Sequence, residues 1–267
     1  RPMPLCLLAL GLTLGLTAGC SESAPPADTR PAAGLTGGKR VDTATAGSLT
    51  GAVRFSGTTQ APEMLKVQND PTCIQILGPS IPSDAVTIDA KGGGANAFVY
   101  VKHDFDGYVF DTPKTPVVFD QRGCRYAPRI FGVRVGQAID IINSDPTLHN
   151  VHAKPAVNAE FNRTQPQRDS HMTQIFTAPE VMVRLTCDVH PWMVGWVGVM
   201  AHPFFAVTSA DGTFTIPGIP AGTYDVAVWH EKLGEVTTSV TIAAGAPATT
   251  RSPERGDRPR AAPSSAP

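Results

Sequence analysis

The segment CDVHPWM at residues 187–193 constrains the fold of this chain more than any other feature. It contains a thiol, an imidazole and a thioether with two residues between each and the next, and apolar runs typical of strands flank it at 181–186 and 194–200. One loop between two strands would therefore hold three lone-pair donors at one end of a sheet. A fourth donor, His149, follows the turn-like run at 143–146, and a β-sandwich is the simplest fold that brings both loops together.

These four side chains form a ligand set typical of copper. Thiolate, imidazole and thioether groups select copper over hard cations, and two His with one Cys and a weak axial Met form a blue-copper site. We therefore predict one type 1 copper ion bound by His149, Cys187, His190 and Met193. Taken singly, each residue type is ordinary in a protein core or surface. The prediction depends on their spacing and on the string HNVH at 149–152.

The two strings together resemble the cupredoxin family, in particular its plastocyanin and amicyanin branch, over roughly residues 130–200. Amicyanins have the same short C-x2-H-x2-M ligand loop and an HNVH string at the first ligand. The resemblance implies a Greek-key β-sandwich that exchanges single electrons by an outer-sphere route. It also implies that Asn150 ties the two ligand loops together.

We expect electrons to leave through an exposed edge of His190. An apolar docking patch of Pro146, Pro191 and Trp192 would surround that edge, although simple packing of Trp192 over the site is an equal alternative. Because redox encounters use small interfaces, the expected partner is a transient one, a redox protein of the cytochrome or dehydrogenase type.

Other functions stay open as alternatives: a non-redox surface module that binds polysaccharide or protein, a copper carrier, and a copper-dependent oxidoreductase with an interfacial site. Catalysis is disfavoured because the chain has no His-x-His pairs of the multicopper oxidase kind, and Cys187 has no second loop cysteine for a dinuclear centre. The net charge of −1 offers no basic surface for nucleic acid. We therefore expect an electron-transfer protein rather than an enzyme.

The rest of the chain predicts an all-β protein. Short alternating runs recur between turn signals, and 25 Gly with 25 Pro favour many turns. A short helix is expected within 156–165. The expected strands cover 49–55, 85–88, 97–102, 117–120, 129–135, 138–143, 150–153, 173–176, 181–186, 194–200, 205–208, 213–216, 223–229 and 236–242.

The string TSADGTFTIPGIPAGTYDVAVWH at 208–230 resembles the carboxypeptidase-regulatory-like, transthyretin-like β-sandwich family, with Asp-Gly as a hairpin turn. The run at 51–55 resembles the opening strand of that module. The copper unit would then be inserted in the module or share one sheet with it. We expect a cupredoxin-like domain at 46–201 and the small β module at 202–245. In the shared-sheet alternative, the first strand of the copper domain also belongs to the β module.

Both ends of the chain differ from a folded core. An apolar run at 5–16 followed by LTAGC resembles a bacterial lipoprotein signal, which predicts a signal peptide at 1–19 and a lipid on Cys20. Cleavage without a lipid is the alternative. A flexible tether at 20–45 and a disordered tail at 246–267 are expected. The protein would be exported and held at the cell envelope by its lipid alone, on the outer membrane facing the periplasm.

Export would place the cysteines in an oxidising compartment. In an oxidising compartment an odd cysteine needs an explanation. Cys73 and Cys124 both follow turn-like breaks, and we predict that they form a disulfide. Cys187 would then be left to bind the metal.

Overall fold

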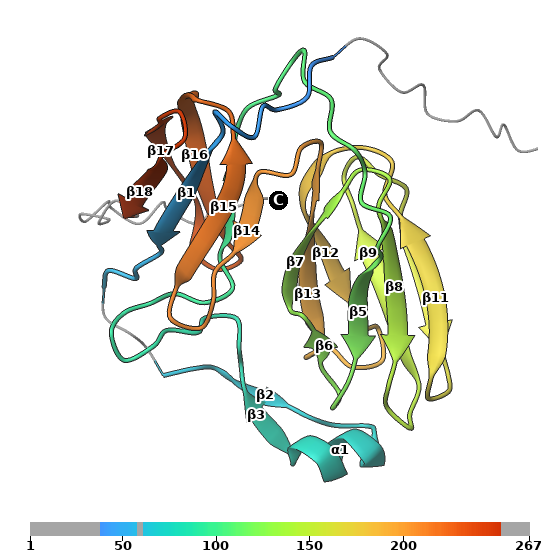
Figure 1. Ribbon diagram of the computed structural model, residues 1–267. Helices are drawn as coiled ribbons and strands as arrows, with labels where there is room; N and C mark the ends of the chain where they lie inside the picture. Colours follow the sequence, from blue (N-terminus) through green and yellow to red (C-terminus); the bar gives the residue numbers. More distant parts are fainter. Residues whose placement is uncertain (1–37, 58–60, 252–267) are drawn as a thin grey trace, which may run out of the picture. The chain divides into compact units, whose positions relative to one another are not determined.

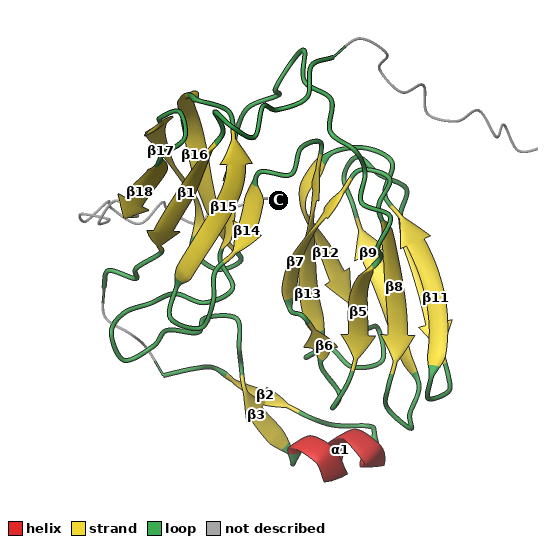
Figure 2. Ribbon diagram, in the orientation of Figure 1, coloured by secondary structure: helices red, strands yellow, loops and turns green. Residues whose placement is uncertain are grey.

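The computed structural model describes residues 38–57 and 61–251 of the chain (Figure 1). In this part the prediction of an all-β chain is confirmed: 18 strands and one short helix make up the secondary structure (Figure 2). No helix among these residues is long and apolar enough to cross a membrane. The predicted signal peptide, the lipidated Cys20 and the tether up to residue 37 lie outside the described residues.

One β-sandwich carries the predicted ligands. Its strands are β5 (Val117–Gln121), β6 (Tyr126–Ala127), β7 (Ile130–Arg134), β8 (Ala138–Asn143), β9 (His149–Lys154), β10 (Phe161–Gln165), β11 (Ser170–Ile175), β12 (Glu180–Thr186) and β13 (Val194–Met200). They form two sheets, with the orders β10-β9-β12-β13-β7 and β11-β8-β5-β6. Pairing is antiparallel except between β13 and β7 and between β5 and β8.

The core of this sandwich follows from the alternation of side chains along its strands. In β8 every second residue is buried, which places Ile139 and Ile141 inside. They join one buried cluster with Phe119 of β5 and Val197 of β13. Cys187 belongs to the same cluster, so the ligand loop forms one end of the core.

A second pair of sheets is built from both ends of the described chain. Its strands are β1 (Gly47–Ala52), β4 (Phe98–Val101), β14 (Phe205–Val207), β15 (Thr213–Ile219), β16 (Gly222–His230), β17 (Gly234–Ile242) and β18 (Pro247–Arg251). The orders are β15-β1-β18 and β14-β4-β16-β17. Leu49, Val99, Ile216 and Ile242 are buried in one cluster between them.

The strand order separates the two sandwiches along the chain. Strands β5 to β13 come between β4 and β14, and no sheet of the described residues combines strands from both groups. This arrangement corresponds to insertion of the ligand-bearing sandwich into the other one. β1 and β4, which fall in the range 46–201 of the expected copper domain, pair instead with strands of the second group.

Three expectations about local structure are wrong. Residues 156–165 hold no helix, because β10 pairs with β9 from Phe161 to Gln165. Residues 85–88 form no strand beyond a bridge between Ile88 and Gly94. The chain turns directly after them, and the Asp89 carboxylate accepts the Gly93 N–H within that turn. The range 246–267 was expected to be disordered, but its part Pro247–Arg251 pairs in parallel with β1, and residues 252–267 lie outside the described residues.

No helix or strand was expected in a short segment between β1 and β4. It comprises β2 (Met64–Lys66), α1 (Pro71–Leu77) and β3 (Ser80–Pro82), and we call residues 64–82 the cap segment. The Asp70 side chain accepts the Cys73 N–H as a helix N-cap, with proline at the first helical position. Gly78 ends the helix with φ 80°, a conformation that favours glycine.

His202 makes the stability of this fold depend on pH. Its imidazole is only 4% exposed beside Phe105 and Phe204, and burial together with Arg134 lowers its pKa to about 4. The pKa of His in an unfolded chain is about 6.5. Between this pKa and the lower pKa of the folded state, the unfolded state binds more protons, so the free energy of unfolding falls as the pH decreases through that range.

We expect His202→Gln to reduce this acid sensitivity. Between pH 7 and pH 4.5 the wild type should lose about 2 kcal/mol more free energy of unfolding than the variant, by the relation of about 1.4 kcal/mol per pKa unit. Urea unfolding at both pH values measures the difference, and carboxylates contribute equally to both chains. An equal loss in the two proteins would contradict the prediction.

Candidate metal centre

The ligand loop lies between two paired strands of the first sandwich. Cys187 follows β12 and Met193 precedes β13, and the strands pair up to Thr186 and Val194. The Cys187 N–H donates to the Met193 carbonyl at 3.2 Å, and the Met193 N–H donates to the His190 carbonyl at 2.9 Å. These bonds close the loop and bring the backbones of its three donor residues close together.

The structure brings the predicted first ligand to the same place. His149 begins β9, which pairs with β12. Its Nδ1 lies 2.8 Å from Nδ1 of His190, and Sγ of Cys187 lies 3.6 Å from the same His190 atom. Both imidazoles are fully buried, and Met193 is 1% exposed in the cluster that contains Cys187. Two imidazole nitrogens and a sulfur that converge in this way fit a soft transition metal such as copper.

The surroundings of the Cys187 thiol favour its ionised form. Burial alone would raise its pKa, but hydrogen bonds with His149 and His190 and from the backbone N–H groups of Asn150 and Val189 outweigh burial and lower the pKa to about 6. The thiolate is the form that binds metals. A sulfur with these partners is therefore available as a ligand near neutral pH.

Asn150 joins the two ligand loops. Its Oδ1 accepts the Asp188 N–H at 2.8 Å and lies 3.2 Å from Cys187 Sγ, and its Nδ2 donates to Asn162 on β10 at 2.7 Å. One side chain on β9 thus fixes the loop that follows β12.

Two carboxylates hold the outer nitrogens of the two imidazoles. Nε2 of His149 lies 3.0 Å from Asp145 Oδ2, and Nε2 of His190 lies 3.1 Å from Asp70 Oδ2. An imidazole that donates its outer N–H to a carboxylate keeps its other nitrogen free as a ligand and becomes more basic. In this structure the free nitrogens are the two Nδ1 atoms that face each other.

Sequence reasoning did not find Asp70 or Asp145. Burial would raise the pKa of Asp145, but His149 and the backbone N–H groups of Cys124 and Gly123 lower it below its usual value. Asp145 stands in the turn-like run before His149, and that position was a usable signal. Asp70 is 120 residues from His190, and nothing near it in the sequence points to the site.

The expected exposed edge of His190 is absent. This side chain is fully buried, because Asp70 covers Nε2 and Cys73 Sγ lies 3.9 Å from the same nitrogen. Trp192 is also buried, at 6% exposure, and its indole N–H donates to the Cys124 carbonyl. Trp192 therefore packs over the site. Of the three residues predicted for a docking patch, only Pro146 and Pro191 are exposed.

A disulfide attaches the cap segment to the sandwich. Cys73 of α1 and Cys124 of the β5–β6 turn are bonded, with their Cα atoms 5.6 Å apart, and Cys187 is the free cysteine among the described residues. Sγ of Cys73 lies close to both imidazoles, and Sγ of Cys124 lies close to His149. Because they form a disulfide, they offer no thiolate to a metal.

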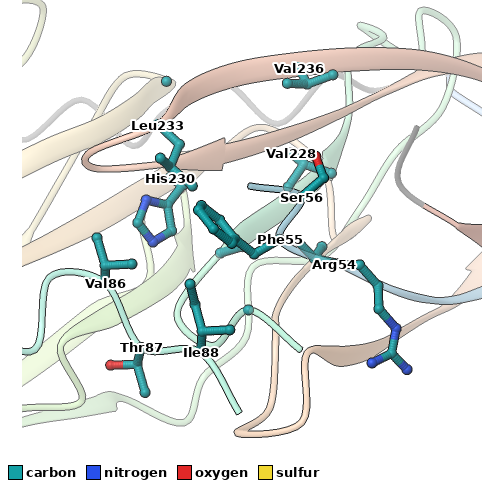
Figure 3. Close-up of a pocket in the computed structure, with 14 residues that line it drawn as sticks. Arg54, Phe55, Ser56, Val86, Thr87, Ile88, Val228, His230, Leu233 and Val236 are labelled. Carbon is teal, nitrogen blue, oxygen red and sulfur yellow. The ribbon is translucent and has the colours of Figure 1, made fainter. Parts of the chain in front are cut away.

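The other sandwich has a concave site of a different kind. A cavity of about 100 Å³ opens among apolar side chains that include Val53, Phe55, Val86 and Leu233, beside His230 (Figure 3). None of the predicted ligands lines it.

Comparison with known proteins gives partial matches. A family model described as polysaccharide lyase family 4, domain II, matches residues 186–250. No curated protein matches the sequence.

Similar solved structures include an amicyanin, a purple cupredoxin and a nitrite reductase. An oxidised amicyanin variant is 28% identical over 32% of this chain and 82% of its own, with a TM-score of 0.29. A purple cupredoxin from Nitrosopumilus maritimus is 20% identical over 32% of this chain and 99% of its own, with a TM-score of 0.28. A copper-containing nitrite reductase from Thermus scotoductus SA-01 is 20% identical over 36% of this chain, with a TM-score of 0.28. The match spans 24% of that reductase.

Proposed function

We propose that this protein is a type 1 copper protein that carries single electrons between redox partners. The observation that carries the proposal is the convergence of His149 Nδ1, His190 Nδ1 and Cys187 Sγ at one buried end of a β-sandwich. These three donors, together with the Met193 thioether, would hold the ion. When bound, copper supplies a one-electron couple.

The role of the protein in this function is to hold the donor side chains in place and to exclude water from them. Asn150 ties the ligand loop to β9, and Asp145 fixes the outer nitrogen of His149. Both imidazoles are fully buried, so water has no direct access to them. Ligands held in this way change little between the two oxidation states, which favours fast electron exchange without chemistry on a substrate.

The proposal extends to location and partners. The protein would be exported and lipid-anchored through Cys20, on the outer membrane facing the periplasm, and would meet a cytochrome or dehydrogenase type of partner transiently. The disulfide between Cys73 and Cys124 supports export, because such bonds persist in oxidising compartments. No enzymatic activity is part of the proposal.

A surface binding module is the second candidate function. It is favoured by one observation, the match of residues 186–250 to a polysaccharide lyase domain. Polysaccharide or protein would then be bound through the sandwich that contains β15 to β17.

Copper titration of the full chain tests the proposal. We expect an intense visible band from thiolate-to-copper charge transfer that saturates at one equivalent of Cu(II) and bleaches reversibly on one-electron reduction. Zn(II) is the control, because it should occupy the same donors without colour. A colourless protein at one equivalent of Cu(II) would favour the binding module instead.

A further inference from the structure

The outer nitrogen of His190 is enclosed by a segment that is remote in sequence. Asp70 Oδ2 lies 3.1 Å from Nε2 of His190, and Sγ of Cys73 lies 3.9 Å from it. Asp70 is itself buried, with 9% of its surface exposed. A buried carboxylate therefore takes the place that solvent would have at this edge of the imidazole.

Asp70 is held in position from both of its oxygens. Oδ1 accepts the N–H of Cys73 at 3.0 Å and caps α1, while Oδ2 accepts the Thr147 hydroxyl at 2.6 Å and faces His190. The Cys73 N–H, the Thr147 hydroxyl and the His190 imidazole thus surround the carboxylate, and hydrogen bonds of this kind favour its charged form. The disulfide of Cys73 fastens the helix that carries the carboxylate to the β5–β6 turn.

We propose that Asp70 is a positioning residue for the metal centre: it fixes the outer N–H of His190 and its negative charge stabilises Cu(II) relative to Cu(I). This inference rests on the proposed copper function. In a one-electron reduction of the bound ion by a reduced partner, no bond to the protein would form or break, and the Nε2 proton would stay on His190. The positive charge of the centre decreases by one in this step, so a buried anion nearby opposes it.

A purely structural role for Asp70 makes a different prediction. Asparagine caps helices as well as aspartate does and keeps a side-chain oxygen for Cys73 N–H, so Asp70→Asn removes the charge and preserves the cap. If capping were the whole role, this variant would keep the wild-type reduction potential. Asp145 is less suited to such a test, because its carboxylate also binds two backbone N–H groups of the β5–β6 turn.

The test is spectroelectrochemical titration of the copper-loaded full chain, with the visible band as the readout. At the same applied potential, the Cu(I)/Cu(II) ratio of Asp70→Asn should be at least about tenfold higher than that of the wild type. For a one-electron couple, a tenfold change in this ratio corresponds to a reduction potential that is ~59 mV higher. Asp70→Glu, which keeps the charge, should restore most of the difference. The control Asp140→Asn removes the same charge on β8, where Asp140 pairs with the exposed His171, and should shift the ratio much less.

The outcomes separate this inference from the proposed function. A normal band in Asp70→Asn with a potential equal to that of Asp140→Asn overturns the inference alone. A wild-type chain without the band overturns both. Nitrogen-15 NMR of the wild-type Cu(I) protein gives a check that needs no variant: Nε2–H of His190 should exchange slowly with solvent, and rapid exchange would overturn the assigned hydrogen bond.

Discussion

Replacing Cys187 with serine is expected to abolish the visible copper band completely. The serine hydroxyl does not ionise at neutral pH and is a hard donor, so neither the charge-transfer transition nor the preference for copper survives. Loss of an outer-shell partner typically costs about 10- to 100-fold in metal affinity, so loss of this ligand should cost more than about 100-fold in Cu(II) affinity. Competition with a chelator of known affinity measures the second effect.

The matched control for this variant is His152→Gln. His152 lies on β9 three residues after His149, but its nitrogens contact Asp188 and Glu160 instead of the buried sulfur. The band should survive in His152→Gln. A band that persists in Cys187→Ser, or that disappears in His152→Gln, would show that the ligand set is wrong.

Removing the disulfide is expected to have the largest effect on stability. The bond joins residues 51 positions apart, and the chain-entropy argument gives about 4 kcal/mol of unfolding free energy for a loop of this length. Cys73→Ala with Cys124→Ala should lose about this amount in urea unfolding. The freed cap segment should also expose His190, so a small reductant such as ascorbate should reduce the copper form faster.

The control for this pair is Ile76→Ala in the same helix. Ile76 is 46% exposed, so this change alters the cap segment without detaching it and should cost less than about 1 kcal/mol. If the double variant lost less than that, the disulfide would not be what holds the segment in place.

The ligand loop could be located from the sequence because its donors are local. Cys187, His190 and Met193 share one loop, and the two flanking strands have apolar runs that lie in the core. The strands of the sandwich were likewise predictable wherever one face is buried, as in β8 with its strict alternation.

Elements that depend on distant partners could not be predicted. β10 presents Asn162, Arg163 and Thr164 to solvent because it is an edge strand, so it lacks an apolar signal. β18 has the sequence PATTR, which contains no large apolar residue, and its strand is defined by pairing with β1. Asp70 lies in a short helix, and its role appears only when the chain brings it to His190.

The insertion of one sandwich between β4 and β14 has a consequence for the order of folding. Every strand from β5 to β13 has its sheet partners within that run of the chain, whereas β1 pairs with β15 and β18, and β4 pairs with β14 and β16. When the chain emerges N-terminus first into the compartment where it folds, the inner sandwich therefore has all of its strands before the outer one does. Since domains generally fold as units, the sandwich that carries the ligand loop is expected to fold first, and the outer sandwich to be completed after it.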